Sequence, residues 1–182
     1  MAHDPLYRFD TAFGVCALGW TERGITRLRL PNVEQDIDAA TAVPNGDVAT
    51  EELPSDIAAC IARLHTYFSG AVIDFTDVTL DFGALAPESA TIYRALRGVG
   101  WGETTTYGAL ATAIGTPGGA RAVGVAMARN PWPVIVPCHR VLASGGRLGG
   151  FSAPGGSRTK ERLLALEHVR AGDSQPLLPG IF

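Results

Sequence analysis

The 182-residue sequence lacks the features that mark secreted and membrane proteins. Its first ten residues contain no basic segment followed by an apolar one, so we expect no secretory signal. All of its apolar runs fall short of the roughly 18 residues that a transmembrane helix needs. These absences predict a cytoplasmic protein that does not contact a membrane.

Cysteine is scarce, and its placement excludes further classes of site. The three cysteines, Cys16, Cys60 and Cys138, are odd in number and widely spaced, which argues against a disulfide framework. The sequence has no Cys-x-x-Cys pair and no closely spaced histidines, so we expect no metal site. It also lacks a glycine fingerprint for nucleotides, so we expect no cofactor.

The sequence does have enough apolar residues for a sizeable core, since 46% of its residues are hydrophobic. Its charges are unevenly distributed. Residues 1–85 contain 5 Lys/Arg and 13 Asp/Glu, whereas residues 86–182 contain 10 and 5. The change of sign indicates two domains, the second facing a polyanion. Chance asymmetry among surface residues is the alternative.

The pattern in the first half predicts a small α+β domain. Alternating apolar residues with turn chemistry at 21–24 predict a strand hairpin over 6–30. Apolar residues at helical spacing predict a helix over 55–69, with Ser55 as its N-cap and Gly70 at its end. The remaining segments are expected to form a polar loop and then a further strand and loop: 31–53 and 71–82.

The second half is predicted to be mostly helical. One helix is expected over 88–97, and a second is expected to begin at a threonine cap within 104–106 and end near Ile114. With a third helix over 120–130, the last two helices form a candidate helix-turn-helix. The third helix is rich in Ala and Gly, which suits either entry into a DNA groove, with Arg121 reaching the DNA, or close helix–helix packing.

The segment VIVPCHRV contains the most reactive group of residues. Its apolar start predicts a buried strand, 134–136, that leads through Pro137 to Cys138 and His139. Neighbouring side chains of a strand face opposite sides, so His139 could reach the thiol only through a bend or a water. A metal ligand would need nearby cysteine or histidine partners, which the spacing does not provide. The residues alone leave a nucleophile and a structural cysteine open.

Two downstream features could complete a site. A glycine-rich segment over 145–156 could wall a pocket or could be an ordinary surface loop. A helix is expected over 159–168, with apolar positions at 163, 164 and 166. Glu167 near its end could orient His139 in a Cys–His–Glu relay, or could lie at a solvated helix end.

Several motifs together resemble one family. PCHRV (137–141) resembles the signature of the O6-alkylguanine-DNA alkyltransferases, which are also called methylated-DNA–protein-cysteine methyltransferases. The similarity extends over 86–168 and is loose over 1–85. Further resembling motifs belong to the family's helix-turn-helix, asparagine turn, substrate loop and last helix: GETTTYGALA (102–111), RAVG (121–124), Asn130-Pro131, GGFS (149–152), Lys160, Leu163, Leu164 and Glu167.

The resemblance implies a fold, a reaction and a partner. It implies an α+β fold with a ribonuclease-H-like N-terminal domain (1–85). A winged-helix-like domain with the helix-turn-helix (86–170) would follow, and the tail (171–182) has no assigned role. It also implies a monomer that acts once, without a cofactor, on double-stranded DNA containing O6-alkylguanine. O4-alkylthymine is a second candidate lesion.

The resemblance assigns five catalytic roles. Cys138 would accept the alkyl group from a flipped guanine, and His139 would act as base through a water. Glu167 would orient His139. Tyr107 would contact the guanine and help to rotate its phosphate, and Asn130 would brace the turn before the active site.

The resemblance also assigns binding residues. Arg121 would fill the gap that the flipped nucleotide leaves, as part of a DNA-binding set: Thr106, Tyr107, Arg121, Ala122 and Gly124. The guanine would be held by Tyr107, Val141, Phe151 and Ser152. Phe151 stands where the family often has tyrosine, and the loop over 151–162 is longer than the shortest family versions. Both departures leave the preferred alkyl size open.

Three other functions remain as alternatives. A lesion sensor of the alkyltransferase-like type would lack the reactive cysteine, so Cys138 argues against it. A cysteine hydrolase would need an oxyanion hole and a distant histidine, and no motif marks either. An alkyltransferase directed at a small molecule or at transcriptional signalling is not excluded, although the positive second half favours DNA.

Overall fold

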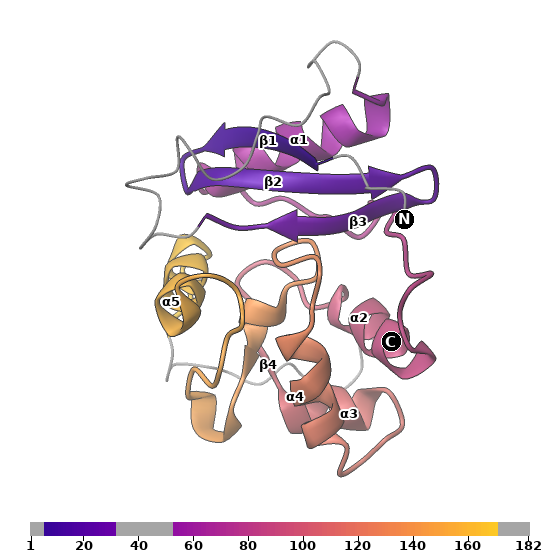
Figure 1. The fold of residues 1–182 in the computed structure, drawn as a ribbon. Helices are drawn as coiled ribbons and strands as arrows, with labels where there is room; N and C mark the ends of the chain where they lie inside the picture. The colour runs from indigo at the N-terminus through magenta and orange to yellow at the C-terminus, as the bar shows by residue number, and fades with distance from the viewer. Residues whose placement is uncertain (1–5, 32–52, 171–182) are drawn as a thin grey trace.

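A three-stranded antiparallel sheet forms one layer of the protein in the computed structural model, which describes residues 6–31 and 53–170 (Figure 1). Its strands are β1 (Leu6–Thr11), β2 (Gly14–Thr21) and β3 (Gly24–Arg29), in the order β1-β2-β3. The predicted hairpin was therefore incomplete, because a second tight turn precedes Gly14 and adds a strand. The predicted loop over 31–53 lies almost entirely outside the described residues, as does the tail.

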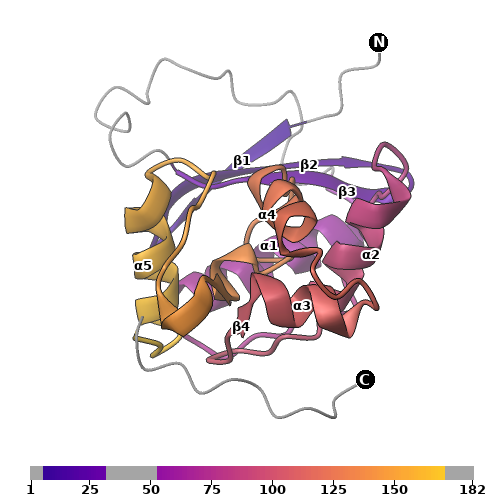
Figure 2. The ribbon, with the colours of Figure 1, turned by 90° about the horizontal axis from the view of Figure 1, so that it is seen from below.

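The described residues include five α-helices. Helix α1 (Ser55–Phe68) lies against the sheet, and the others lie beside the β3 edge (Figures 1 and 2). Stacking of Phe13 on Phe68, with ring centroids 5.1 Å apart, fixes α1 to the sheet. The other helices are α2 (Pro87–Leu96), α3 (Tyr107–Ala113), α4 (Ala120–Ala128) and α5 (Gly156–Leu166). Helix α5 thus begins three residues before the predicted start at 159.

Both ends of α1 can be explained from its sequence. The helix ends as predicted, because Gly70 adopts φ +94° and the N–H groups of Gly70 and Ala71 bond the carbonyls of Tyr67 and Thr66. The prediction that Ser55 is the N-cap was wrong. Pro54 occupies that position, and no side chain caps the helix there.

The predicted strand within 71–82 was also wrong. Only Leu80 pairs with the sheet, in a single parallel bridge to Ile25 of β3. The physical reason is Arg97, whose Nη2 donates to the carbonyls of Phe75, Thr76 and Val78 at 2.7 Å each. Three carbonyls that converge on one guanidinium cannot form a regular ladder.

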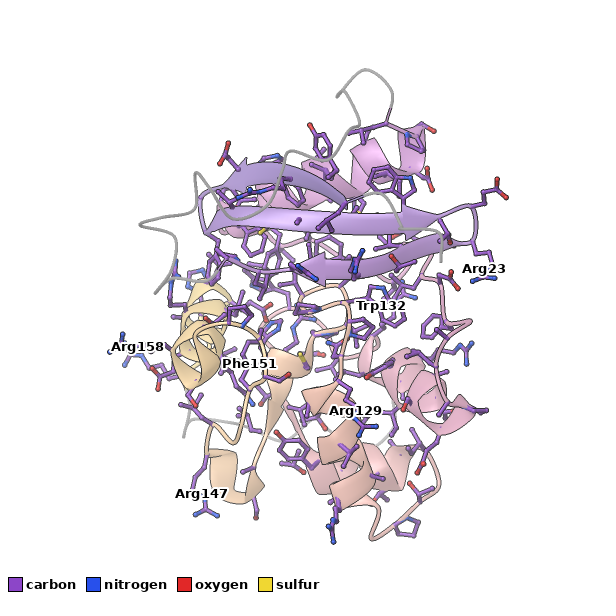
Figure 3. All side chains as sticks on the ribbon, in the orientation of Figure 1. Arg23, Arg129, Trp132, Arg147, Phe151 and Arg158 are labelled. Atoms are coloured by element: carbon purple, nitrogen blue, oxygen red, sulfur yellow. The ribbon has the colours of Figure 1, made fainter. Side chains whose placement is uncertain are left out.

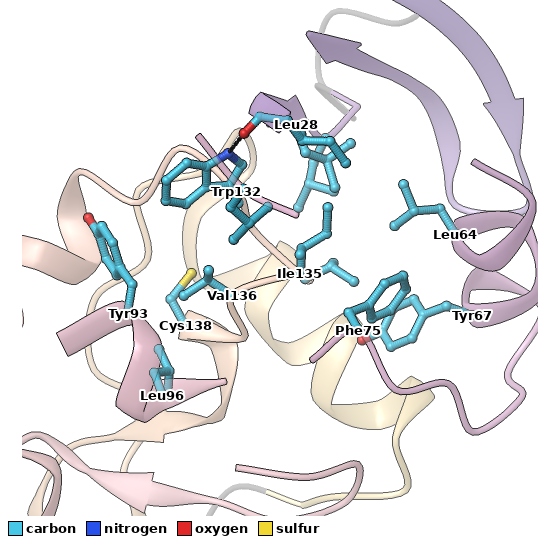
Figure 4. Close-up of a cluster of buried hydrophobic side chains, with 14 of the residues drawn as sticks. Leu28, Leu64, Tyr67, Phe75, Tyr93, Leu96, Trp132, Ile135, Val136 and Cys138 are labelled. Atoms are coloured by element: carbon cyan, nitrogen blue, oxygen red, sulfur yellow. Dashed lines mark hydrogen bonds between the residues drawn. The ribbon is translucent and has the colours of Figure 1, made fainter. Parts of the chain in front are cut away.

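The β3 edge joins the two halves of the chain. The Leu28 N–H donates to the Pro131 carbonyl at 2.8 Å, and the Trp132 indole N–H donates to the Ile25 carbonyl at 2.8 Å (Figure 4). Around this seam, side chains from both halves form one continuous apolar core, which includes Leu18, Leu64, Tyr93 and Val136. The segment that follows Trp132 is therefore anchored before it reaches Cys138.

A short parallel pair positions the elements on either side of the candidate site. Strand β4 (Thr105–Thr106) pairs with β5 (Val141–Leu142), with Thr105 opposite Val141. Because β4 leads directly into α3 and β5 follows Arg140, this pairing places Tyr107 beside the reactive segment. Helices α3 and α4, the two helices of the candidate helix-turn-helix, pack against each other.

Candidate active site

The segment before Cys138 is a turn and not the predicted strand. Val134 has φ +77°, an unusual conformation for a β-branched residue, and the Val136 N–H donates to the Trp132 carbonyl at 2.8 Å. Pro137 then leads into a 3₁₀ turn, Cys138–Arg140. Three consecutive apolar residues predicted a strand, but the structure buries them in a compact loop. Strain of this kind clusters at functional sites.

Asn130 explains how this turn is held. Its Nδ2 donates to the Val136 carbonyl at 2.8 Å and to Cys138 Sγ at 3.1 Å. Its Oδ1 accepts from the Trp132 N–H at 3.0 Å. One side chain at the end of α4 therefore braces the turn and contacts the candidate nucleophile. This position agrees with the bracing role that the resemblance assigned.

Cys138 opens into a pocket of about 380 Å³. Walls come from α3, α4 and the glycine-rich segment, which therefore lines a pocket as predicted. Within the described chain the lining residues are uncharged: Tyr107, Gly124, Met127, Ala128, Cys138, Gly150, Phe151 and Ser152. Three of the four residues expected to hold the base, Tyr107, Phe151 and Ser152, are thus brought together. The fourth, Val141, is buried in β5 beside them.

Cys138 is only 5% exposed, and the environment of its thiol sets its reactivity. Burial raises the pKa of Cys138, while the hydrogen bond from Asn130 and the charge of Lys160 oppose that rise. The resting group is therefore a thiol. A base must take its proton before it can attack a carbon.

His139 is fully buried, and its ring lies against Glu167. Its Nε2 is 2.8 Å from Glu167 Oε1, and its Nδ1 has no hydrogen-bond partner among the described residues. Burial lowers the pKa of His139 and outweighs the opposing hydrogen bond and charge of Glu167. A neutral ring whose Nε2–H donates to Glu167 leaves the Nδ1 lone pair to accept a proton.

Arg140 completes a buried ion pair with Glu167. Its Nε and Nη2 donate to the two carboxylate oxygens at 2.9 and 2.8 Å, and its Nη1 donates to the Val99 carbonyl at 2.5 Å. Burial alone would raise the pKa of Glu167, but the hydrogen bonds and charges of His139 and Arg140 hold it well below the usual range. The solvated helix end considered for Glu167 is therefore wrong.

Two further buried groups contact this region. The Tyr67 hydroxyl of α1 donates to Glu167 Oε1 at 2.6 Å. Lys160 is buried, and its Nζ donates to the Val141 carbonyl at 2.6 Å. Burial lowers the pKa of Lys160 to about 8, against the opposing effect of Cys138. Sequence reasoning gave neither Tyr67 nor Arg140 a place beside Glu167. Only the adjacency of Arg140 to His139 offered a signal.

The residues expected to bind DNA lie at the start of α3 and in the first half of α4. Thr106 caps α3 through a 3.1 Å bond from the Ala109 N–H, and Arg121 is exposed near the start of α4. A Cβ at Gly124 would meet no described atom within 4 Å, so helix packing does not explain that glycine. Ala122 is half-buried beside them. Further exposed arginines lie at the end of α4, on the glycine-rich segment and on α5: Arg129, Arg147 and Arg158 (Figure 3).

Two other findings bear on the expected classes of site. Within 6–31 and 53–170, no group of three or more His, Cys, Asp or Glu side chains is placed to hold a metal ion. In the same ranges, no helix combines the length and the apolar character that crossing a bilayer requires.

Sequence comparison identifies relatives with this arrangement. Residues 87–169 match the DNA-binding domain of 6-O-methylguanine DNA methyltransferase. The chain is 38% identical to a methylated-DNA–protein-cysteine methyltransferase of Mycolicibacterium paratuberculosis, over 87% of this chain and 88% of that one. It is 36% identical to the mouse protein of that name, over 94% and 84% of the two chains.

Structural comparison agrees. The crystal structure of Mycobacterium tuberculosis OGT in complex with DNA superposes with a TM-score of 0.70 at 34% identity, covering 90% of this chain and 92% of that one. O6-methylguanine-DNA methyltransferase from Pyrococcus kodakaraensis superposes at 0.62 with 26% identity, over 90% and 98%. The mixed α/β fold with its small antiparallel sheet is confirmed, and the chain belongs to the methylated-DNA–protein-cysteine methyltransferase family.

Proposed function

We propose that this protein repairs DNA by direct reversal, transferring the alkyl group of O6-alkylguanine irreversibly to its own Cys138. The observation that carries the proposal is the position of the thiol. Cys138 lies at an uncharged pocket of about 380 Å³, held by Asn130 and adjoining the buried His139–Glu167 pair. Pockets of a few hundred Å³ suit small molecules and single bases.

In the chemical step the alkyl group moves from O6 of guanine to the sulfur of Cys138. In net terms the sulfur loses one proton and the guanine gains one. The thiol proton of Cys138 moves through a water to His139 Nδ1, and the imidazolium is stabilised by Glu167. Sulfur then bonds to the alkyl carbon as the bond from that carbon to O6 breaks, and the electron pair stays on the guanine. Guanine gains one proton as it leaves. The thioether is stable, so each molecule acts once.

Tyr107 is suited to assist the leaving base. Burial raises the pKa of its hydroxyl, and the nearby Cys138 raises it further. The hydroxyl therefore stays protonated at neutral pH and can donate to the departing guanine. The carbonyl of Val141 accepts from Lys160 but keeps a second lone pair for the base, beside Phe151 and Ser152.

DNA binding by α4 explains how the buried thiol reaches its substrate. The O6 position of a stacked guanine is out of reach of this pocket, so the nucleotide must be flipped at a cost of roughly a few kcal/mol. Helix α4, slim at Ala122 and Gly124, enters the minor groove, and Arg121 fills the gap in the base stack. Thr106 and Tyr107 contact the neighbouring backbone at the start of α3.

The proposal extends to the architecture and to the setting. Residues 1–85 form a ribonuclease-H-like domain, supported by the order β1-β2-β3 with α1 against the sheet. Residues 86–170 form a winged-helix-like domain, supported by the packed pair α3 and α4. The protein acts as a cytoplasmic monomer on double-stranded DNA, and O4-alkylthymine is a second substrate.

One experiment tests the reaction directly. The protein is incubated with a duplex that contains a single O6-methylguanine, and its peptides are mapped by mass. We expect one methyl group on Cys138, one turnover, and no transfer by Cys138→Ala. Cys60→Ala is the matched control, because burial raises the pKa of Cys60 to about 12 and leaves it unreactive. A methyl group on Cys16 or Cys60, or repeated turnover, would contradict the proposal.

A further inference from the structure

Tyr67 reaches the catalytic network from the other half of the chain. It lies on α1, is fully buried, and donates its hydroxyl to Glu167 Oε1 at 2.6 Å. The same oxygen of Tyr67 is 3.4 Å from His139 Nε2. Tyr67 is separated from Glu167 by 100 residues in the sequence, so no local sequence pattern connects the two.

The ring of Tyr67 is fixed by its surroundings. Phe68, Phe75 and Trp101 make edge-to-face contacts with it, at centroid distances of 5.2, 5.8 and 5.3 Å. Figure 4 shows Tyr67 beside Phe75 in the buried cluster. Trp101 also precedes Gly102, whose N–H lies 3.4 Å from Glu167 Oε2. The hydroxyl is therefore held at one place relative to the carboxylate.

The hydroxyl is a permanent donor. Burial and then the charge of Glu167 raise the pKa of Tyr67 well above its ordinary value, so the phenol stays protonated. Glu167 Oε1 thereby receives three donors, from Tyr67 at 2.6 Å and from His139 Nε2 and Arg140 Nη2 at 2.8 Å each. A carboxylate oxygen has about two lone-pair sites, so three donors compete for it and each is held less strongly than it would be alone.

We propose that Tyr67 is a positioning residue for alkyl transfer, whose hydroxyl limits how strongly Glu167 draws on the Nε2 proton of His139. The proposal rests on the proposed function. By withdrawing charge from Glu167 Oε1, the hydroxyl keeps the imidazole neutral, with Nδ1 free to receive the thiol proton. The first half of the chain thus contributes to the chemistry as well as to the fold.

Tyr67→Phe tests the proposal because it keeps the ring and removes only the hydroxyl. The charged groups that act on His139 are then Lys160 from α5, Glu167 directly after that helix, and Arg140 from its own turn. With one donor fewer, Glu167 stabilises the imidazolium more strongly. We expect the pH midpoint of His139 protonation to rise by roughly one unit, since a hydrogen bond to a charged group is worth about a tenfold change.

Two measurements report that midpoint. Nitrogen-15 NMR of histidine-labelled full-length protein follows the ring of His139 with pH. The single-turnover rate with free O6-benzylguanine gives the acidic limb of the reaction without any contribution from DNA binding. Both midpoints should move upward together in Tyr67→Phe.

Tyr93→Phe is the matched control. Tyr93 is also a buried tyrosine, and its hydroxyl donates to a carbonyl, that of Ala126, at 2.6 Å. Its loss should lower the melting temperature to a similar degree and leave the His139 midpoint unmoved. A purely structural role for Tyr67 predicts the same result for both variants.

The outcomes separate this inference from the proposed function. If wild-type protein alkylates Cys138 and both midpoints of Tyr67→Phe equal those of wild type, the positioning role is overturned while the function stands. If wild-type protein transfers no alkyl group, the proposed function fails, whatever NMR reports. A raised midpoint in Tyr67→Phe and not in Tyr93→Phe supports the positioning role.

Discussion

Cys138 and His139 are neighbours in the chain, yet their side chains face two different environments. Cys138 lies at a pocket whose described lining carries no charge. His139 is not among the residues that line this pocket, and it is buried where Glu167, Arg140 and Tyr67 form a closed network without exposed surface on the carboxylate. A neutral pocket can accept an uncharged base. The charged groups that assist proton transfer, Glu167 and Arg140, are buried outside the pocket.

The largest expected effect comes from disrupting the buried network around Glu167. Glu167→Gln leaves Arg140 buried without its carboxylate, which typically costs about 3–5 kcal/mol of unfolding free energy. The amide can also hold His139 in the wrong tautomer, so we expect single-turnover transfer to fall by roughly a hundredfold or more. Urea unfolding and the rate with O6-benzylguanine measure the two effects.

Glu161→Gln provides the control for that variant, because Glu161 is exposed on α5, the helix that leads to Glu167. It should leave both stability and rate close to wild type. If Glu167→Gln unfolds at the wild-type urea midpoint, the buried network does not contribute to stability and the contrast between the pocket and this network is lost.

An intermediate effect is expected at Arg121, which is exposed on α4. Arg121→Ala removes the side chain proposed to fill the DNA stack, and flipping alone costs roughly a few kcal/mol. Repair of a duplex should fall about tenfold or more, whereas reaction with free O6-benzylguanine should be unchanged. Arg23→Ala removes an exposed arginine of the β2–β3 turn, on a different element, and serves as the control. Equal losses on both substrates would contradict the finger role.

The last effect, on stability and not on alkyl transfer, is expected at Lys160, which borders both environments. Its pKa falls from 10.5 to about 8 on folding, so between these values the unfolded chain binds more protons and stability rises with pH. The cost of the buried charge is therefore greatest below pH 8. Lys160→Met should lose this contribution, and unfolding free energies measured from pH 7 to 10.5 report it. If the stability difference between the variant and wild type does not change with pH, the lysine is not buried as a cation.

The sequence predicted the helical elements better than the site. Apolar spacing and glycines located α2 and the end of α1, because these signals are local. The strand predicted at 134–136 failed because the apolar run is buried in a turn that Asn130 holds from outside it. Tyr67 could not be found at all, since its contact with Glu167 exists only after the two halves of the chain pack together.

The seam at β3 has a consequence for the behaviour of the chain during synthesis. The free edge of a sheet can pair with another copy and start aggregation. Here the Pro131 carbonyl and the Trp132 indole bond the β3 backbone, and Leu80 adds a bridge at Ile25. The first half emerges from the ribosome before residues 131–132 exist. Until they arrive, the Leu80 bridge alone covers that edge and the Leu28 N–H lacks its partner, so the nascent first half passes through an interval in which self-association competes with folding.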